Sequence, residues 1–185
     1  MKQQLTLGEF EGRELKQALS RAHVELPALT MIAHWRRCGL TADWLASMMA
    51  YDFEDREQAT GVLSTVVNEL LENAVKYCSG GDNAVSVSVA HFGDELLIEA
   101  TNMADERRVR ALYTHFSRLE AEGADKLFEE LAVRSDRAAD AGVGLIILQR
   151  DYGVAIAAQA EDLGESGLWK VRIQAMLPAE EMTHA

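Results

Sequence analysis

Three polar side chains on one stripe of a predicted helix have the types that a metal–phosphate ligand needs. Glu69, Asn73 and Lys76 are spaced i, i+4 and i+7, so they share one side of an α-helix. An asparagine oxygen can ligate Mg²⁺, a glutamate can orient or deprotonate a hydroxyl, and a lysine can neutralise phosphate charge. By spacing alone, an ordinary amphipathic helix with a solvated polar stripe is the commoner explanation.

A second group of candidate residues follows the helix. Gly142, Val143, Gly144 and Leu145 open an apolar run that is predicted to be helical to about residue 152. Free N–H groups in a glycine-containing loop that enters a helix can hold phosphate. A helix that simply starts near two glycines is the alternative reading.

The elements that must position these residues are read from hydrophobic periodicity. Strict alternation from Ala84 to His91 predicts a half-buried strand, and Gly93-Asp94 predicts a hairpin turn. Asn102 follows the returning strand, where we expect its side chain to face a cleft. The predicted helices cover 12–24, 28–37 (closed by Gly39), a short segment carrying Trp44, 56–78, 107–116, 120–133 and the run to 152. The predicted strands cover 84–91, 96–101, 154–160 and 168–177. Residues 1–10 are either a strand or a frayed end.

This order predicts an α+β two-layer sandwich, a mixed and mainly antiparallel sheet with helices on one face. We expect an N-terminal helical extension over residues 1–55, a main domain over 56–178 and a loose tail over 179–185. The Trp and Met side chains of residues 28–50 fit either core packing or a partner surface.

Composition limits the classes of function. The chain has 185 residues, 48% of them hydrophobic, and a net charge of −12. An acidic chain without a basic cluster is a poor ligand for nucleic acid or anionic membrane. No run approaches a bilayer-spanning length. Cys38 and Cys78 have no metal-type spacing, so we expect reduced thiols in a cytoplasmic protein.

The motifs together resemble the ATP-binding module of the GHKL superfamily, which includes gyrase B, Hsp90, histidine kinases, MutL and the anti-sigma-factor kinases. Residues 69–77 resemble its N-box, residues 142–145 its glycine box, and Asn102 the position of its adenine-reading Asp. The closing segment 153–178 is similar to the final hairpin of histidine-kinase catalytic domains. The resemblance implies a Bergerat-type fold, with ATP and Mg²⁺ as ligands.

Site roles come from the same resemblance. It implies that Asn73 is the Mg²⁺ ligand, Glu69 the catalytic base, Lys76 a phosphate-proximal group and Tyr77 an aromatic near the nucleotide. Gly142, Val143, Gly144 and Leu145 would form the phosphate cradle. Residues 103–140 would be the ATP lid, with Arg134 or Arg137 neutralising γ-phosphate charge.

Residues 33–46, leading toward the N-box, further resemble small stand-alone bacterial regulators of the SiaB/slr type, which are thought to act in partner switching. This implies serine/threonine phosphorylation of a small antagonist or STAS-like protein, and a dimer with residues 28–50 as its interface. The alternative is a non-catalytic nucleotide-binding module that sequesters a partner. Asn102 and Ala104 favour that alternative, because a neutral acceptor is weaker than a carboxylate by about 1 kcal/mol and Ala104 replaces a glycine.

Overall fold

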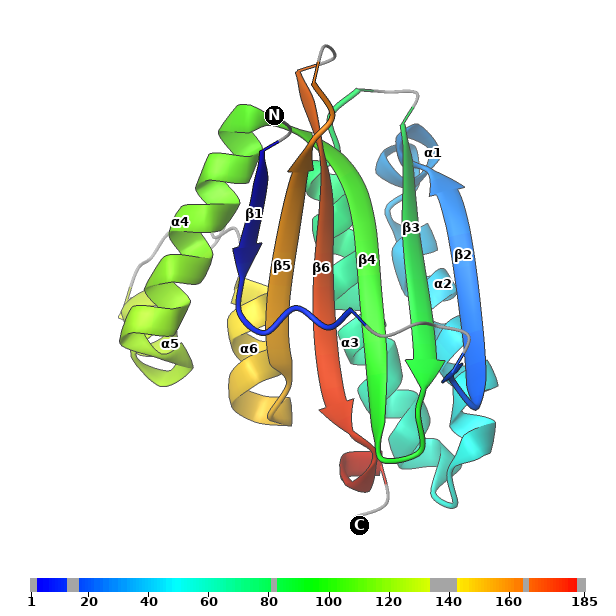
Figure 1. Cartoon of the computed structure of the whole chain (residues 1–185). Coiled ribbons are helices and arrows are strands. Elements are labelled where there is room, and N and C mark those ends of the chain that lie inside the picture. Colours follow the sequence, from blue (N-terminus) through cyan, green and yellow to red (C-terminus); the bar gives the residue numbers. More distant parts are fainter. Residues whose placement is uncertain (1–2, 13–16, 81–82, 134–142, 165–166, 183–185) are drawn as a thin grey trace.

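The computed structural model of the chain describes residues 3–12, 17–80, 83–133, 143–164 and 167–182. They form one six-stranded sheet in the order β1-β5-β6-β4-β3-β2 (Figure 1). The strands are β1 (Gln4–Leu7), β2 (Ser20–Pro27), β3 (Ala84–His91), β4 (Glu95–Asp105), β5 (Ala155–Asp162) and β6 (Leu168–Pro178). The α+β prediction is confirmed. The predicted mixed sheet is wrong, because every strand pair among the described residues is antiparallel.

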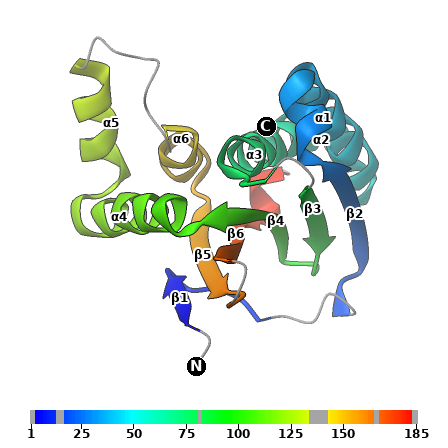
Figure 2. The ribbon, with the colours of Figure 1, turned by 90° about the horizontal axis from the view of Figure 1, so that it is seen from above.

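Helices cover one face of the sheet. They are α1 (Ala28–Ala33), α2 (Arg36–Met49), α3 (Arg56–Tyr77), α4 (Glu106–Glu122), α5 (Ala124–Val133) and α6 (Val143–Tyr152), with 3₁₀ turns η2 (Ala50–Asp52) and η3 (Ala179–Met182). Figure 2 shows α1, α2, α3 and α6 on the same side of the strands. Among the described helices none is both long and apolar enough to cross a membrane.

The predicted long helix is confirmed as α3, which lies at the centre of the helical layer. Asp55 caps its start, since the carboxylate accepts from the Gln58 N–H at 3.0 Å. Lys76 lies in the last turn, where a positive charge is favourable. The side chains that α3 buries are Ala59, Leu63, Val66, Val67, Leu70, Leu71, Ala74 and Val75. Because α3 packs on β3, β4, α2 and α6, its rotation about its own axis is set by the core.

The segment before residue 28 differs most from the sequence prediction. Residues 20–24, expected to be helical, belong to edge strand β2, which pairs with β3 from Ser20 opposite His91 to Pro27 opposite Ala84. Arg21, His23 and Glu25 are exposed, while the residues between them are buried or half-buried, so this stretch has a period of two. The helical spacing of Leu19 and Ala22 competed with this alternation, and the β3 edge decided between them.

The next two predicted helices are divided differently in the structure. The chain turns at residues 34–35, and α2 then runs unbroken through Gly39 to Met49. Gly39 is therefore inside a helix and does not end one. The buried residues of α2, Cys38, Ala42, Leu45, Ala46 and Met49, pack toward α3 and hold the helix continuous across the glycine.

The remaining boundaries are close to prediction. Strand β4 continues to Asp105, so Asn102 lies within it and not at its end. Gly123, with φ +81°, separates α4 from α5. Residues 134–142 lie outside the described residues. The predicted loose tail is wrong up to Met182, whose side chain is fully buried against the core.

The sheet face away from the helices is polar where the chain leaving β1 crosses it (Figure 1). Gln174 is buried there, and its amide accepts from the Glu11 N–H at 2.9 Å and donates to Glu99 at 2.8 Å. The hydrogen bond from Glu11 therefore holds this crossing segment against the sheet.

Candidate functional site

A pocket lies between α3, α4 and the central strands β4 and β6. Its lining consists of Asn73, Tyr77, Asn102, Ala104, Arg108, Ala111, Leu112, His115, Leu145, Val171 and Ile173. Most of these groups are apolar, and a few polar ones converge, which is the usual composition of a small-molecule site. The structure thus brings together four residues predicted from sequence: Asn73, Tyr77, Asn102 and Leu145.

Three polar atoms of this pocket are buried without a hydrogen-bond partner in the described structure. They are Asn73 Nδ2, Tyr77 Oη and His115 Nε2. Buried polar groups are nearly always paired, so each orphan here calls for an explanation, and a bound ligand is one. Rotating the Asn73 amide by 180° would exchange Nδ2 for Oδ1, the atom that a cation or a ligand donor would need. Asn73 therefore fits the binding role expected from sequence.

Asn102 is 3% exposed and lies opposite Val171 in the β4–β6 pair. Its Nδ2 donates to the Met103 carbonyl at 3.3 Å, which makes Oδ1 the end that can accept from a ligand. Ala104, two residues further along the same strand and 2% exposed, adds a methyl group to the pocket wall. The wall therefore offers a neutral acceptor beside an apolar surface.

Glu69 lies one helical turn before Asn73, and it contacts the start of α6 rather than lining the pocket. A Cβ built on Gly144 would overlap the Glu69 carboxylate, so only a glycine leaves room for this contact. Burial, and secondarily the charge of Glu72, raises the pKa of Glu69 above its ordinary 4.5. A carboxylate with a raised pKa is a stronger base, as the predicted role requires.

Glu69 is also reached from a groove between α2 and α3, separate from the pocket. The groove is lined by Trp35, Arg36, Gly39, Asp43, Ser64, Thr65, Asn68, Glu69 and Glu72. Asn68 donates to Glu72 at 3.0 Å, and Ser64 donates to Asp43 at 2.6 Å, which fixes two of its carboxylates. Glu69 is thus accessible from the α2–α3 groove, which shares no lining residue with the pocket.

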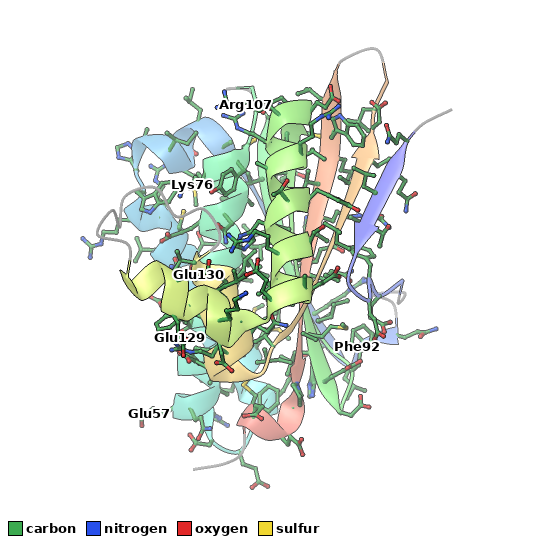
Figure 3. The ribbon with its side chains drawn as sticks, turned by 90° about the vertical axis from the view of Figure 1, so that its left-hand side faces the viewer. Glu57, Lys76, Phe92, Arg107, Glu129 and Glu130 are labelled. Carbon is green, nitrogen blue, oxygen red and sulfur yellow. The ribbon has the colours of Figure 1, made fainter. Side chains whose placement is uncertain are left out.

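The other predicted residues are placed less centrally. Lys76 is exposed, with its Nζ 5.6 Å from the centre of the Tyr77 ring, outside the pocket lining. Figure 3 shows Lys76 and Arg107 toward the end of the molecule at which α4 begins. Val143 and Gly144 are half-exposed at the start of α6. Gly142, Arg134 and Arg137 lie outside the described residues.

Sequence reasoning missed the contribution of α4 to the pocket. Arg108, Ala111, Leu112 and His115 all line it, and their spacing of i, i+3, i+4 and i+7 is the signal that could have found them. Burial, and secondarily the positive charge of Arg118, lowers the pKa of His115. His115 is therefore a neutral imidazole facing the cavity near pH 7.

A small polar network anchors α4 beside the pocket. Asp105 caps α4 by accepting from the Arg108 N–H at 2.9 Å, and Ser79 donates to the other Asp105 oxygen at 2.9 Å. Arg108 also contacts both Ser79 and Asp105 through its guanidinium. The backbone hydrogen bond from Arg108 is the main cause of a lowered pKa at Asp105. This network joins the end of α3 to the start of α4.

The cavity itself is small, about 60 Å³. Typical ligand pockets hold about 300–1,000 Å³. Leu112 and His115 of α4 are among its lining residues, so a ligand of nucleotide size requires the lining to rearrange.

No protein-family model matches the chain, and no curated protein is similar to it.

Proposed function

We propose that the chain is an ATP- and Mg²⁺-binding regulator of the GHKL type, with a Bergerat-like fold, that phosphorylates serine or threonine on a small partner protein. The observation that carries the proposal is the convergence of Asn73, Tyr77 and Asn102 on one mostly apolar pocket, with buried orphan polar atoms in it. In the sequence resemblance, Asn73 and Tyr77 belong to the N-box, and Asn102 stands at the position of the adenine-reading Asp.

The pocket wall supports an aromatic base as the ligand. Ala104, Leu145, Val171 and Ile173 offer apolar surface, and Asn102 Oδ1 can accept from an exocyclic amino group. The neutral amide gives weaker binding than a carboxylate would, by about 1 kcal/mol. We therefore expect nucleotide affinity in the weaker part of the range for such sites.

The cation would be held by Asn73 on the protein side. Among the described residues no three His, Cys, Asp or Glu side chains are grouped as a metal site. Mg²⁺ commonly takes one or two protein oxygens together with phosphate oxygens and water, and when bound it would offset phosphate charge. A single asparagine oxygen is compatible with that pattern.

The raised pKa of Glu69 and its access from the α2–α3 groove support its role as the base. In the proposed transfer, the acceptor hydroxyl oxygen bonds to the γ-phosphorus, and the bond from that phosphorus to the β,γ-bridging oxygen breaks to release ADP. The hydroxyl proton passes to the Glu69 carboxylate.

A non-catalytic module that binds nucleotide and sequesters a partner is the second candidate function. The Ala104 methyl group and the neutral Asn102 in the pocket wall favour it, because both weaken recognition of the base. Retention of Glu69 in contact with Gly144 favours the kinase, since binding alone does not require a carboxylate there.

The deciding experiment is a calorimetric and thermal-shift titration with ATP, ADP and Mg²⁺. At a hundredfold excess over Kd, a ligand specific for the native state adds about 2.7 kcal/mol of stability. We expect a Mg²⁺-dependent shift that Asn73→Ala abolishes. Asn68→Ala is the matched control, because Asn68 is on the same helix but lines the groove and not the pocket.

Catalysis is then tested with labelled ATP. Glu69→Gln should bind nucleotide with unchanged affinity and lose phosphate release or transfer to a co-purified protein. No shift at millimolar nucleotide would refute nucleotide binding. Binding without any turnover in the wild type would favour the sequestering module.

A further inference from the structure

A second cavity lies on the face of the sheet away from the helices. Residues 8–12, the crossing segment, run from the end of β1 across β5 and β6 (Figure 1). The cavity beside this segment has a volume of about 370 Å³ and is lined by side chains from β3, β4, β5, β6 and the crossing segment itself. Its volume is in the range of small-molecule sites, so it has room for a small ligand.

Strand alternation separates this cavity from the pocket between α3 and α4. Val171 and Ile173 of β6 line the pocket, whereas Arg172 and Gln174 of the same strand line the cavity. Successive side chains of a strand point to opposite faces, so the two sites lie back to back across the sheet. The residues assigned to the nucleotide therefore do not account for the polar groups of the cavity.

Gln174, which is 2% exposed, holds the wall of the cavity in place. Its side-chain amide pairs twice with the backbone of Glu11, because Oε1 accepts from the N–H at 2.9 Å and Nε2 donates to the carbonyl at 3.1 Å. Nε2 also donates to Glu99 Oε2 at 2.8 Å. Since both amide hydrogens and the amide oxygen are engaged, Gln174 fixes the crossing segment and orients the Glu99 carboxylate.

Two side chains of opposite charge line the cavity without neutralising each other. Glu99 of β4 accepts from the neutral Gln174 amide, and Arg172 of β6 donates to the neutral Gln159 amide. The Arg172 guanidinium also lies over the Phe10 ring, 4.9 Å from its centre. Within the described ranges neither Glu99 nor Arg172 takes part in an ion pair. Each charge is therefore available to a ligand group of the opposite sign.

The register of β4 and β6 sets the spacing of the two charges. Glu99 is opposite Gln174 and Arg172 is opposite Thr101, so Glu99 and Arg172 are diagonal neighbours on one face of the sheet. Diagonal neighbours in an antiparallel pair are about 7–8 Å apart. A small molecule whose cationic and anionic groups are a few bonds apart can therefore contact both side chains at once.

We propose that this cavity is a binding site for a neutral α-amino acid, with the ligand carboxylate on Arg172 and the ligand ammonium on Glu99. The Ser88 hydroxyl can accept from the same ammonium, and Phe10 and Leu97 supply apolar surface for the ligand side chain. A simple anion is opposed by Glu99 and by the net charge of −12, and a simple cation is opposed by Arg172. The inference does not depend on nucleotide binding, and its test uses the protein without nucleotide.

The first test is calorimetric titration of the full chain with L-alanine, L-serine, L-valine and L-leucine in turn. We expect saturable binding of at least one of them at millimolar concentration or below. The matching acid without the amino group and the matching amine without the carboxylate should each bind at least about tenfold more weakly, because each loses one charge-assisted contact. No binding of any of the four amino acids overturns the proposal. Equal affinity for an analogue with a single charge overturns the assignment of a zwitterion.

Substitutions of the two charged residues locate the site. Glu99→Gln keeps an oxygen that can accept from Gln174 and removes the charge. Affinity for the amino acid should fall at least about tenfold, while affinity for the acid without the amino group should not fall. Arg172→Gln should weaken both ligands by a similar factor, and Arg172→Lys, which keeps a positive charge, should retain part of the affinity.

Arg21→Gln and Glu25→Gln are the matched controls, because both residues are exposed on the same face of the sheet in edge strand β2 and neither lines the cavity. Both should leave the affinity for the amino acid unchanged. Circular dichroism and thermal melting of each variant exclude misfolding, and the comparison of analogues on the wild type requires no variant. Unchanged affinity in both Glu99→Gln and Arg172→Gln overturns the proposed site.

Discussion

The surroundings of Glu69 determine its pKa. Burial against the start of α6 and the charge of Glu72 both disfavour its ionised form, so its pKa is raised. A group with a raised pKa in the folded state opposes stability as it ionises. The free-energy cost of ionising Glu69 therefore grows as the pH rises above its ordinary value of 4.5, and it is complete above the raised pKa of the folded state.

The pH dependence of turnover tests this account at the residue scale. Glu72→Gln removes the repulsive charge and leaves the burial, so the pKa of Glu69 should fall while staying above its ordinary value. The acid limb of the kcat profile should move to lower pH, and nucleotide affinity should not change. Asp43→Asn, also in the groove but not a cause of the Glu69 shift, should leave the limb in place.

Gly144 tests the contact between α6 and α3. In Gly144→Ala the new methyl group would overlap the Glu69 carboxylate, so Glu69 has to move away. We expect reduced turnover with little loss of stability, because the atoms that must move belong to a flexible side chain and not to the backbone. Gly61→Ala on α3, where an added Cβ meets nothing within 4 Å, is the control and should not be destabilising. Unchanged turnover in Gly144→Ala would contradict the assigned position of Glu69.

At the scale of elements, the proposed function assigns to α4 the movement that admits a nucleotide. It contributes Arg108, Ala111, Leu112 and His115 to the pocket, and it is held at its start by Asp105 and Ser79. The cap at Asp105 can therefore act as the fixed end of α4 while the remainder of the helix moves away from α3 to admit a ligand.

Removing the cap should weaken this element in a pH-dependent way. Asp105→Ala should lower the free energy of unfolding by about 1 kcal/mol at neutral pH. Because the pKa of Asp105 is lowered in the folded state from 3.8, the contribution of its charge is complete above that value. It is lost as the pH falls through the lower, folded pKa.

Denaturant unfolding at several pH values measures the difference in the free energy of unfolding between the wild type and Asp105→Ala. Asp105→Asn keeps a capping oxygen without the charge. The difference in the free energy of unfolding between Asp105→Asn and Asp105→Ala should therefore not vary with pH in this acidic range. Asp105 is 45% exposed, and solvent therefore screens the charge effect. A pH-independent difference between wild type and Asp105→Ala would contradict a role for the ionised carboxylate.

At the scale of the whole molecule, stability depends on the single large core between the helical layer and the sheet. Leu70, at the centre of α3, is fully buried in it. Leu70→Ala should cost about 2–5 kcal/mol, from lost burial and the cavity that is left. For a chain of this size the melting temperature should fall by roughly 4–20 °C.

Thermal and denaturant unfolding check this prediction. Leu19→Ala is the control, because Leu19 is 74% exposed and should lose less than about 0.5 kcal/mol. Equal effects of the two substitutions would mean that α3 is not the centre of the core.

Much of the order of elements was predictable because it depends on local periodicity. The 3.6-residue pattern of α3 is long and uninterrupted, and its buried residues follow it. The two-residue pattern over 84–91 correctly predicted a strand, but β3 is buried on both faces from Val87 to His91 and is not half-buried as expected. The line Glu69, Asn73, Lys76 follows from helix geometry alone. The short stretch around Ser20–Pro27 fits either period, and it became a strand because the edge of β3 supplies hydrogen-bond partners from a distant part of the chain.

The sequence by itself determined the types and local spacing of the polar groups, and so the candidate chemistry. Only the tertiary structure decided which of them meet: Asn73, Tyr77 and Asn102 share a pocket, whereas Glu69 contacts Gly144 and a separate groove. The contribution of α4 to that pocket and the exposure of Leu40, Trp44 and Met48 on α2 were also decided at this level. The physical reason is that burial and contact depend on neighbours that are far away in sequence, and periodicity carries no information about those neighbours.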